Sequence, residues 1–290
     1  MRYKRRVAST FNRAARTYAK QAVLQDIVVS RLAERLDLFR ISPTNILDVG
    51  SGCGNGSRLL EAKYPDATIL ALDLALEMLR THRGKGLRRW WSRQRFICGD
   101  AERLPLMNQS VDLIFSSLAL HWCVDLDAAL RELHRVLRPG GLLLFTLPGP
   151  DTLKELRASW AKIDDATHVN NFFDMHDVGD ALVRARLSSP VVDVENLTMT
   201  YQDVFALMRD LKSIGVRNVN EGRPLRLTGK GRLQQLATNY EHFRRDGVLP
   251  ATYEVVYGHA WAPEPGQRPQ DGSTVASFPI ANLRRRATNQ

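Results

Sequence analysis

Cysteine is scarce in this sequence, and its few cysteines are not spaced for disulfide bonding or for metal binding. Cys53, Cys98 and Cys123 are the only three among 290 residues, and none belongs to a C-x-x-C pair. The histidines show no H-E-x-x-H spacing. An odd number of scattered thiols argues against a disulfide framework and against a zinc site. We therefore expect a protein of the reducing cytoplasm with no bound metal.

Long apolar runs, internal repeats and low-complexity segments are missing as well. Since a membrane-spanning helix needs about 20 apolar residues in succession, the sequence predicts no membrane partner. The composition, 44% hydrophobic and 25% charged, is typical of a globular protein. At this length, one large domain with insertions is favoured over two separate domains.

Acidic residues are outnumbered, and the first 25 residues contain none. The formal net charge is +10, which suits an acidic partner but can also serve solubility alone. The basic start of the chain resembles a mitochondrial transit peptide. However, Phe11, Ala14, Ala15 and Tyr18 recur at helical spacing, and the apolar pattern continues beyond them. We therefore predict a structural N-terminal helical cap over residues 1–40, with Tyr18 turned inward.

From residue 41 on, apolar strand patterns alternate with helical patterns. Strands joined by helices in this way form a parallel, doubly wound α/β sheet. Pro139-Gly140-Gly141 is expected to end the third of the helices and to precede the fifth strand. The spacing predicts strands at residues 46–49, 68–72, 95–98, 111–116 and 142–147, and helices at residues 55–62, 74–82 and 126–137.

The later part of the chain alternates less regularly. Helices placed between late strands suit a lid over the strand ends. We predict a domain over residues 41–262 with helical lid insertions near 151–175 and 202–246, followed by a loose tail over 263–290. Thr152 is a candidate cap of the first late helix. The patterns predict helices at 151–162, 177–185, 202–214 and 231–245, strands at 191–199 and 252–261, and a segment at 278–283 that could dock.

A glycine-rich turn follows the first strand and opens a helix. It reads Asp48-Val49-Gly50-Ser51-Gly52-Cys53-Gly54. Glycines allow a sharp turn and close approach of the backbone to a ligand, and a helix N-terminus offers unpaired N–H groups. The spacing is G-x-G-x-G, with Ser57 where a third NAD-type glycine would stand. No G-K-S/T follows, which excludes a nucleoside-triphosphate P-loop.

Acidic residues stand at the ends of the second and third strands. Asp73 lies about twenty residues past the glycine turn, the distance at which a carboxylate accepts from ribose hydroxyls. Alternatively it is the N-cap of the following helix, and both roles can coexist. Asp100, which follows Gly99, can accept from an exocyclic adenine amine or can be a turn acid.

The fourth strand runs into Ser116-Ser117-Leu118-Ala119-Leu120-His121-Trp122. Ligands of open α/β sheets lie outside the carboxyl ends of the strands, near the point where the strand order reverses. We therefore expect His121 and Trp122 to face the reacting centre and, with Tyr18, to be the candidate catalytic residues. The alternative is that this His-Trp pair packs in the core.

Taken in order, these motifs resemble the cofactor-binding run of class I S-adenosylmethionine-dependent methyltransferases, over residues 45–147. The resemblance implies a Rossmann-like, mostly parallel sheet of seven strands whose last strand is antiparallel, and S-adenosylmethionine as cofactor. It places the methionine part at residues 50–54, the ribose at Asp73, the adenine at Asp100 and Ala101, and the sulfonium beside Ser117 and Leu118. The predicted cofactor-binding residues are Asp48, Gly50, Ser51, Gly52, Asp73, Leu74, Met78, Asp100, Ala101, Ser117 and Leu118.

A narrower resemblance covers most of the chain. It is to the malonyl-acyl-carrier-protein O-methyltransferases of biotin synthesis, and it implies methylation of the free carboxyl of malonyl-acyl carrier protein. His121 departs from that family, in which we expect glutamine. The alternatives are the related assembly factors of respiratory complex I, which share Ser116-Ser117-Leu118, His121-Trp122 and Asp151-Thr152-Leu153, and a methyltransferase acting on another small molecule or protein. The segments that carry the narrower resemblance are residues 11–18, 118–123, 211–216, 221–223 and 249–253.

The residues show no acid–base dyad, and the implied reaction needs none, because a carboxylate is ionised at neutral pH. Exclusion of water favours a step in which opposite charges cancel, so a lid is expected. Lys212, Arg217 and Arg223 are candidate anchors for the malonyl carboxylate, or are surface charges. The resemblance makes an acidic acyl carrier protein the expected partner of this basic chain. No RNA-binding module or N-P-P-Y/F amine site is present, so no nucleic-acid partner is expected.

Overall fold

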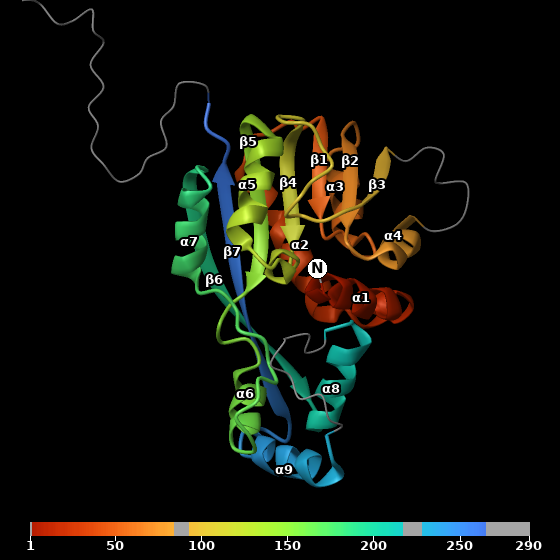
Figure 1. Cartoon of the computed structure of the whole chain (residues 1–290), viewed down its shortest axis with the longest axis vertical. Helices are drawn as coiled ribbons and strands as arrows, with labels where there is room; N and C mark the ends of the chain where they lie inside the picture. Colours follow the sequence, from red (N-terminus) through yellow and green to blue (C-terminus); the bar gives the residue numbers. More distant parts are fainter. Residues whose placement is uncertain (1, 84–92, 217–227, 265–290) are drawn as a thin grey trace, which may run out of the picture.

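A single seven-stranded sheet forms the centre of the computed structural model, which describes residues 2–83, 93–216 and 228–264 (Figure 1). The strand order is β3-β2-β1-β4-β5-β7-β6. The first five strands are parallel, and β7 is antiparallel to both β5 and β6. This confirms the predicted class I methyltransferase sheet. The strands are β1 (Asn45–Val49), β2 (Thr68–Asp73), β3 (Gln94–Cys98), β4 (Val111–Ser117), β5 (Leu137–Pro148), β6 (Ser188–Tyr201) and β7 (Leu249–Trp261).

Helices cover both faces of the parallel strands. On one face lie α2 (Val23–Glu34) and α3 (Asn55–Lys63), whose apolar residues pack with β1, β2 and β4. On the other face lie α5 (Leu126–Val136) and α7 (Met175–Arg184). The central strands are buried on both faces, which explains why they read as unbroken apolar runs. Among the described residues, the short 3-10 helices η1 (Arg35–Leu38) and η3 (Leu120–Trp122) connect these elements.

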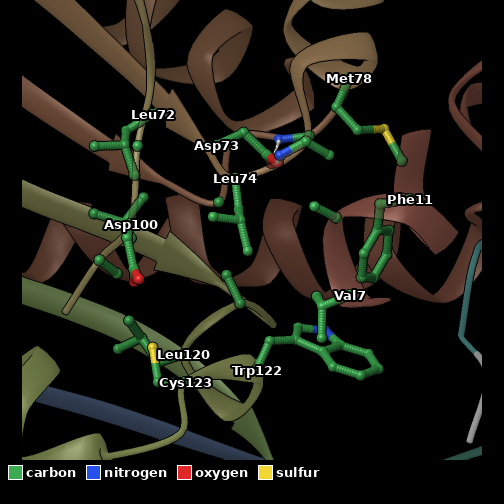
Figure 2. Close-up of a pocket in the computed structure, with 18 of the residues that line it drawn as sticks. Val7, Phe11, Leu72, Asp73, Leu74, Met78, Asp100, Leu120, Trp122 and Cys123 are labelled. Carbon is green, nitrogen blue, oxygen red and sulfur yellow. Dashed lines mark hydrogen bonds between the residues drawn. The ribbon is translucent and has the colours of Figure 1, made fainter. Parts of the chain in front are cut away.

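Helix α1 (Arg2–Gln21) lies across the carboxyl ends of the parallel strands (Figure 1). It contacts α4 (Leu76–Arg83), where the Asn12 side chain accepts from the Glu77 amide at 2.9 Å. Its Val7 and Phe11 side chains point towards the strand ends (Figure 2). The apolar spacing of this segment therefore has a partner surface in the fold, as the helical prediction requires.

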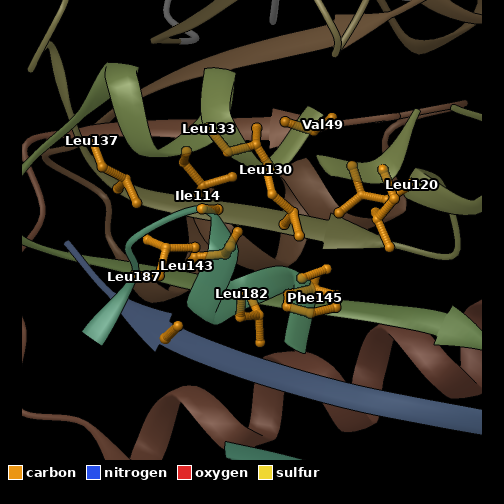
Figure 3. Packing of buried hydrophobic residues seen from close by; sticks show 14 of the residues in the cluster. Val49, Ile114, Leu120, Leu130, Leu133, Leu137, Leu143, Phe145, Leu182 and Leu187 are labelled. Carbon is orange, nitrogen blue, oxygen red and sulfur yellow. The ribbon is translucent and has the colours of Figure 1, made fainter. Parts of the chain in front are cut away.

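Side chains of alternate strand positions supply the two main cores. In the core shown in Figure 3, Leu130 and Leu133 of α5 and Leu182 of α7 pack with Ile114 and Leu143 of the sheet. All five side chains are fully buried. Burial of a leucine side chain contributes about 1.5–3 kcal/mol, so this layer is a principal source of the free energy of folding.

The two last strands in the sheet order extend beyond the other strands. β6 and β7 have 14 and 13 residues, and their ends carry α6 (Lys154–Ala161), α8 (Val204–Ser213) and α9 (Lys230–Glu241) (Figure 1). These helices share a third core that includes Trp160, Leu207 and Tyr240. They thus pack on the extended ribbon of β6 and β7, and α8 reaches α1 through a 2.9 Å hydrogen bond from Thr17 to the Ser213 carbonyl.

Two local predictions are wrong. Pro139-Gly140-Gly141 lies within β5, because α5 ends at Val136 and the strand begins at once; Gly140 has a φ of 72° and accompanies a register shift against β4. Thr152 does not cap α6. Its hydroxyl donates to the Glu254 carbonyl, and the residue before the helix is Leu153 with a φ of 56°.

The predicted division into an N-terminal cap, a domain with lid insertions and a tail stays an interpretation. Residues 265–290, including the segment at 278–283, lie outside the described residues. Among the helices of the described ranges, none combines the length and the apolar character needed to cross a bilayer.

Candidate active site

A cavity opens between α1 and the carboxyl ends of β1 to β4 (Figure 2). Its empty volume, open mouth and solvent included, is about 750 Å³. It lies where the strand order reverses between β1 and β4, the position of ligands in open α/β sheets. The residues predicted to bind cofactor that line it are Gly50, Gly52, Asp73, Leu74, Met78, Asp100, Ala101, Ser117 and Leu118.

Glycines allow the turn after β1 to adopt its conformation and to pack closely against neighbouring side chains. Gly50, Gly52 and Gly54 have φ values of 72°, 53° and 89°, in the left-handed region that favours glycine. A Cβ atom on Gly50 would lie 2.1 Å from the Cβ of Ala119, so no side chain fits there. The backbone of this turn therefore forms the cavity wall itself.

Asp48 supports this turn from behind. Its carboxylate is buried and accepts from the Ser57 hydroxyl at 2.5 Å, which fixes the first turn of α3. Burial raises the pKa of Asp48 to about 7, although the hydrogen bonds from Ser57 oppose the rise. Asp48 lies outside the main cavity and contributes to the smaller one behind it.

Asp73 connects the glycine-rich turn after β1 to the segment before α4. One carboxylate oxygen accepts from the Gly52 amide at 2.9 Å, and the other accepts from the Ala75 amide at 2.7 Å (Figure 2). Burial raises its pKa to about 6, although these amides oppose the rise. Because α4 begins at Leu76, Asp73 lies three residues before the helix and closes the turn that precedes it rather than capping the helix itself. Asp73 also lines the cavity, and its contact with ribose stays a prediction.

Asp100 forms an ion pair with Lys4, a contact that the sequence analysis did not predict. Lys4 of α1 donates to both of its carboxylate oxygens and lies 2.8 Å from Glu102 Oε1. The Lys4 and Glu102 side chains are mostly buried, with 16% and 17% of their surface exposed. This cluster fixes the start of α1 over the third strand end.

A second, smaller cavity lies next to the first, and Tyr18 lines both spaces. Ser51 and Gln25 line it, and the Ser51 hydroxyl and the Gln25 carbonyl oxygen are buried without a hydrogen-bond partner among the described residues. Burial raises the pKa of Tyr18. Unpaired buried polar atoms are costly, and here they face a space that a polar ligand end would fill.

Trp122 and His121, predicted to share a role, point in different directions. Trp122 lines the cavity and meets Phe11 of α1 edge to face at 5.3 Å between ring centroids. His121 does not line it; its ring lies against Trp122 and Phe172, and burial lowers its pKa to about 3. The structure therefore places Trp122 in the cavity lining but not His121, because consecutive residues of a 3-10 turn point about 120° apart. The catalytic role of either residue stays a prediction.

Several cavity residues were missed by sequence reasoning. They are Lys4, Val7, Phe11, Ala119 and Cys123. The apolar stripe of α1 could have suggested Val7, which continues the spacing of Phe11, but nothing local indicates Lys4. Of the candidate carboxylate anchors, Lys212 is exposed on α8 and does not line the cavity. Arg217 and Arg223 lie outside the described residues. In the part of the chain that is described, no group of His, Cys, Asp or Glu could hold a metal ion.

Comparison with known proteins gives consistent matches. A family described as "Methyltransferase domain" matches residues 47–145. A malonyl-acyl-carrier-protein O-methyltransferase from Laribacter hongkongensis is 52% identical over 283 residues, 95% of each chain. One from Methylovorus sp. is 49% identical and covers 95% of this chain and 94% of its own.

Solved structures match in fold. The YcgJ protein from Bacillus subtilis has a TM-score of 0.58 at 18% identity and covers 82% of this chain and 98% of its own. A putative methyltransferase from Bacillus halodurans has a TM-score of 0.57 at 18% identity, with 81% and 99% covered. At such low identity these structures support the sheet and its topology only.

Proposed function

Because this chain belongs to the malonyl-acyl-carrier-protein O-methyltransferase family, we propose that it methylates the free carboxylate of a malonyl group carried on acyl carrier protein, an early step of biotin synthesis. The observation that carries the proposal is a sequence identity of 48–52% to two such enzymes, over nearly the whole length of both chains. The methyltransferase family model matches residues 47–145, whereas the shared length covers 95% of this chain and so extends well beyond that common core.

S-adenosylmethionine is the methyl donor of this proposal, and it supplies a methyl group on a positively charged sulfur. The cavity fits such a molecule. Asp73 offers a carboxylate for ribose hydroxyls, and Gly50 and Gly52 place their backbone in the cavity lining. The unpaired Ser51 and Gln25 oxygens suit the polar methionine end. Asp100, Ala101, Leu74 and Met78 are proposed to surround the adenine, and Ser117 and Leu118 to lie beside the sulfonium.

The reaction is a balanced displacement that needs no general base. A malonyl carboxylate oxygen forms a bond to the methyl carbon as the carbon–sulfur bond breaks, and the sulfur keeps the electron pair. The products are a methyl ester and a neutral thioether. Since the carboxylate is already ionised at neutral pH, no proton moves.

The protein's part is to position the reactants and to exclude water. Opposite charges cancel as the new bond forms, so an apolar, closed site raises the rate by removing solvation from the separated charges. Val7 and Phe11 of α1 cover the strand ends from outside, and Trp122 meets Phe11 from the sheet side. Holding the two reactants in line can lower the activation free energy by about 7–11 kcal/mol. Tyr18 and Trp122 are therefore the side chains that we propose face the substrate.

The alternative is an assembly factor of respiratory complex I. It has the same fold and the same cofactor run, so the cavity alone does not separate the two. The relatives that match nearly the whole chain favour the carboxyl methyltransferase. Several of them, at 41–52% identity, are named malonyl-acyl-carrier-protein O-methyltransferase. An acyl carrier protein is accordingly the proposed partner, rather than nucleic acid or a membrane, and the cytoplasm is the proposed compartment.

A labelled-methyl transfer assay with three acceptors tests the proposal. The purified full chain is incubated with S-adenosylmethionine carrying a labelled methyl group and with malonyl-carrier protein, acetyl-carrier protein or a respiratory-chain protein extract. The proposal predicts label on malonyl-carrier protein only, since the acetyl group has no free carboxylate. Label on a respiratory-chain protein, with none on malonyl-carrier protein, would establish the alternative.

A further inference from the structure

One side of α1 carries a row of cations without acidic partners. At 3.6 residues per turn, these cations fall within about 100° of the helix circumference. The helix contains no acidic residue, and within the described part of the chain no ion pair involves any of them. All are exposed except Arg6, which is half-exposed. This outer basic face consists of Arg2, Arg5, Arg6, Arg13, Arg16 and Lys20.

The remaining sides of α1 are already in contact with the protein. Val7, Phe11 and Tyr18 line the cavity on the opposite side. Asn12 is bonded to α4 on one flank, and Thr17 is bonded to α8 on the other. The outer basic face is therefore the side of α1 left for solvent or for another molecule.

Helix stability does not explain this clustering. Like charges three and four residues apart, such as Arg2 with Arg5 and Arg13 with Arg16, destabilise a helix. Cations near a helix N-terminus are also unfavourable, because the N-terminal end of the helix dipole is positive. The arrangement therefore imposes a cost on the free protein, which an acidic partner would relieve.

We propose that the outer basic face is the docking surface for an acidic carrier protein, an inference that rests on the proposed function. A 20-residue helix is about 30 Å long, which matches a helix-sized acidic surface. A carrier docked there lies about one helix diameter, about 10 Å, from the residues that line the cavity. Opposite charges on the two surfaces would steer the encounter and fix its orientation. Nucleic acid and anionic lipid are less favoured, because this face backs the cavity in which a carrier-bound acyl group reacts.

A charge-reversal variant with a matched control tests the docking surface. The test variant combines Arg5→Glu, Arg13→Glu and Arg16→Glu. The control combines Arg40→Glu, Lys162→Glu and Lys230→Glu, three exposed cations elsewhere that have no ion pair in the described structure. Each is assayed with malonyl-carrier protein and with a small malonyl thioester that lacks the carrier. Urea unfolding checks that the variants fold.

The proposal predicts a KM for malonyl-carrier protein raised by about tenfold or more in the test variant, with little change for the small thioester and little change in the control. The KM of the wild type for the carrier should also rise with salt, whereas that for the small thioester should not. If the Glu variant does not fold, the salt series and the corresponding Arg→Gln variant test the docking surface instead.

Three results would overturn the docking surface while leaving the methyl transfer intact. They are an unchanged KM for the carrier in the test variant, an equal loss with both substrates, and a selective loss of binding to an RNA duplex or to anionic phospholipid vesicles with carrier KM unchanged. If the wild type does not methylate carrier-bound malonate at all, the proposed function fails, and the docking surface fails with it.

Discussion

Lys4 of α1 donates to both carboxylate oxygens of Asp100, the acid that follows β3, across 96 positions of sequence. The same ammonium reaches Glu102, whose carboxylate accepts from the Asp125 amide at 3.2 Å in the loop before α5. One cation thus ties the covering helix to two of the loops that border the cavity. The closed position of α1 is set by this partly buried cluster as well as by apolar packing.

Lys4→Met should weaken binding of S-adenosylmethionine, because it releases the start of α1 and leaves two carboxylates close together without a cation. Loss of charge-assisted hydrogen bonds of this kind corresponds to about 1–2 kcal/mol, or a five- to thirtyfold increase in Kd. Lys4→Arg should retain most of the affinity, and Lys162→Met should leave it unchanged. Tighter binding by Lys4→Met in calorimetry would mean instead that Lys4 competes with the ligand for Asp100.

Asp73→Ala should also weaken binding of S-adenosylmethionine, by about 1–3 kcal/mol, because ligand hydroxyls lose their acceptor and the Gly52 and Ala75 amides lose theirs. Asp73→Asn, which keeps one acceptor oxygen, should lose less. Calorimetry with the pure protein measures both variants. Unchanged affinity in the alanine variant would remove Asp73 from the site, and binding of NADH would contradict the cofactor assignment altogether.

Asp48 predicts a specific pH dependence of stability. Its pKa is raised by burial to about 7, against an ordinary value of 3.8. Between these values the folded protein keeps a proton that the unfolded chain has released, so the free energy of unfolding falls as pH rises. From about pH 5 to about pH 8, it should fall by about 2–3 kcal/mol more in the wild type than in Asp48→Asn. Urea unfolding at both pH values measures this, and equal falls would contradict the raised pKa.

His121 and Trp122 should differ sharply in their effect on turnover. His121→Gln should leave kcat/KM within about threefold, equivalent to less than about 1 kcal/mol, because the ring lies outside the cavity lining. Trp122→Ala removes the edge contact with Phe11 and should lower kcat/KM by about tenfold or more. A large loss of kcat in His121→Gln at unchanged stability would return His121 to the list of catalytic candidates.

Features that depend on near neighbours in sequence were predictable. The turn at Gly50 and Gly52 and the acid at Asp73 belong to one strand–helix–strand unit, so their spacing fixes their relative positions. The parallel sheet followed equally from the alternation of apolar patterns. Its antiparallel last strand came from the family resemblance, because nothing in residues 249–261 alone indicates which strand is the partner.

Features that depend on distant packing were not predictable. The pairing of Lys4 with Asp100 requires knowing where α1 lies. The full lengths of β6 and β7 were underestimated, because their outer ends pair only with each other and pack on helices rather than in the central core. His121 and Trp122 were assigned together because they are adjacent, whereas the 3-10 turn separates their directions.

The most direct test of the central claim is the chemical form of the transferred methyl group. Malonyl-carrier protein is labelled by the full chain with methyl-labelled S-adenosylmethionine and then treated with mild base. The proposed reaction predicts release of the label as volatile methanol, because a methyl ester hydrolyses to methanol whereas methyl groups on nitrogen or sulfur do not. Label that stays on the carrier protein or on the enzyme after base treatment would contradict methylation of the carboxyl group.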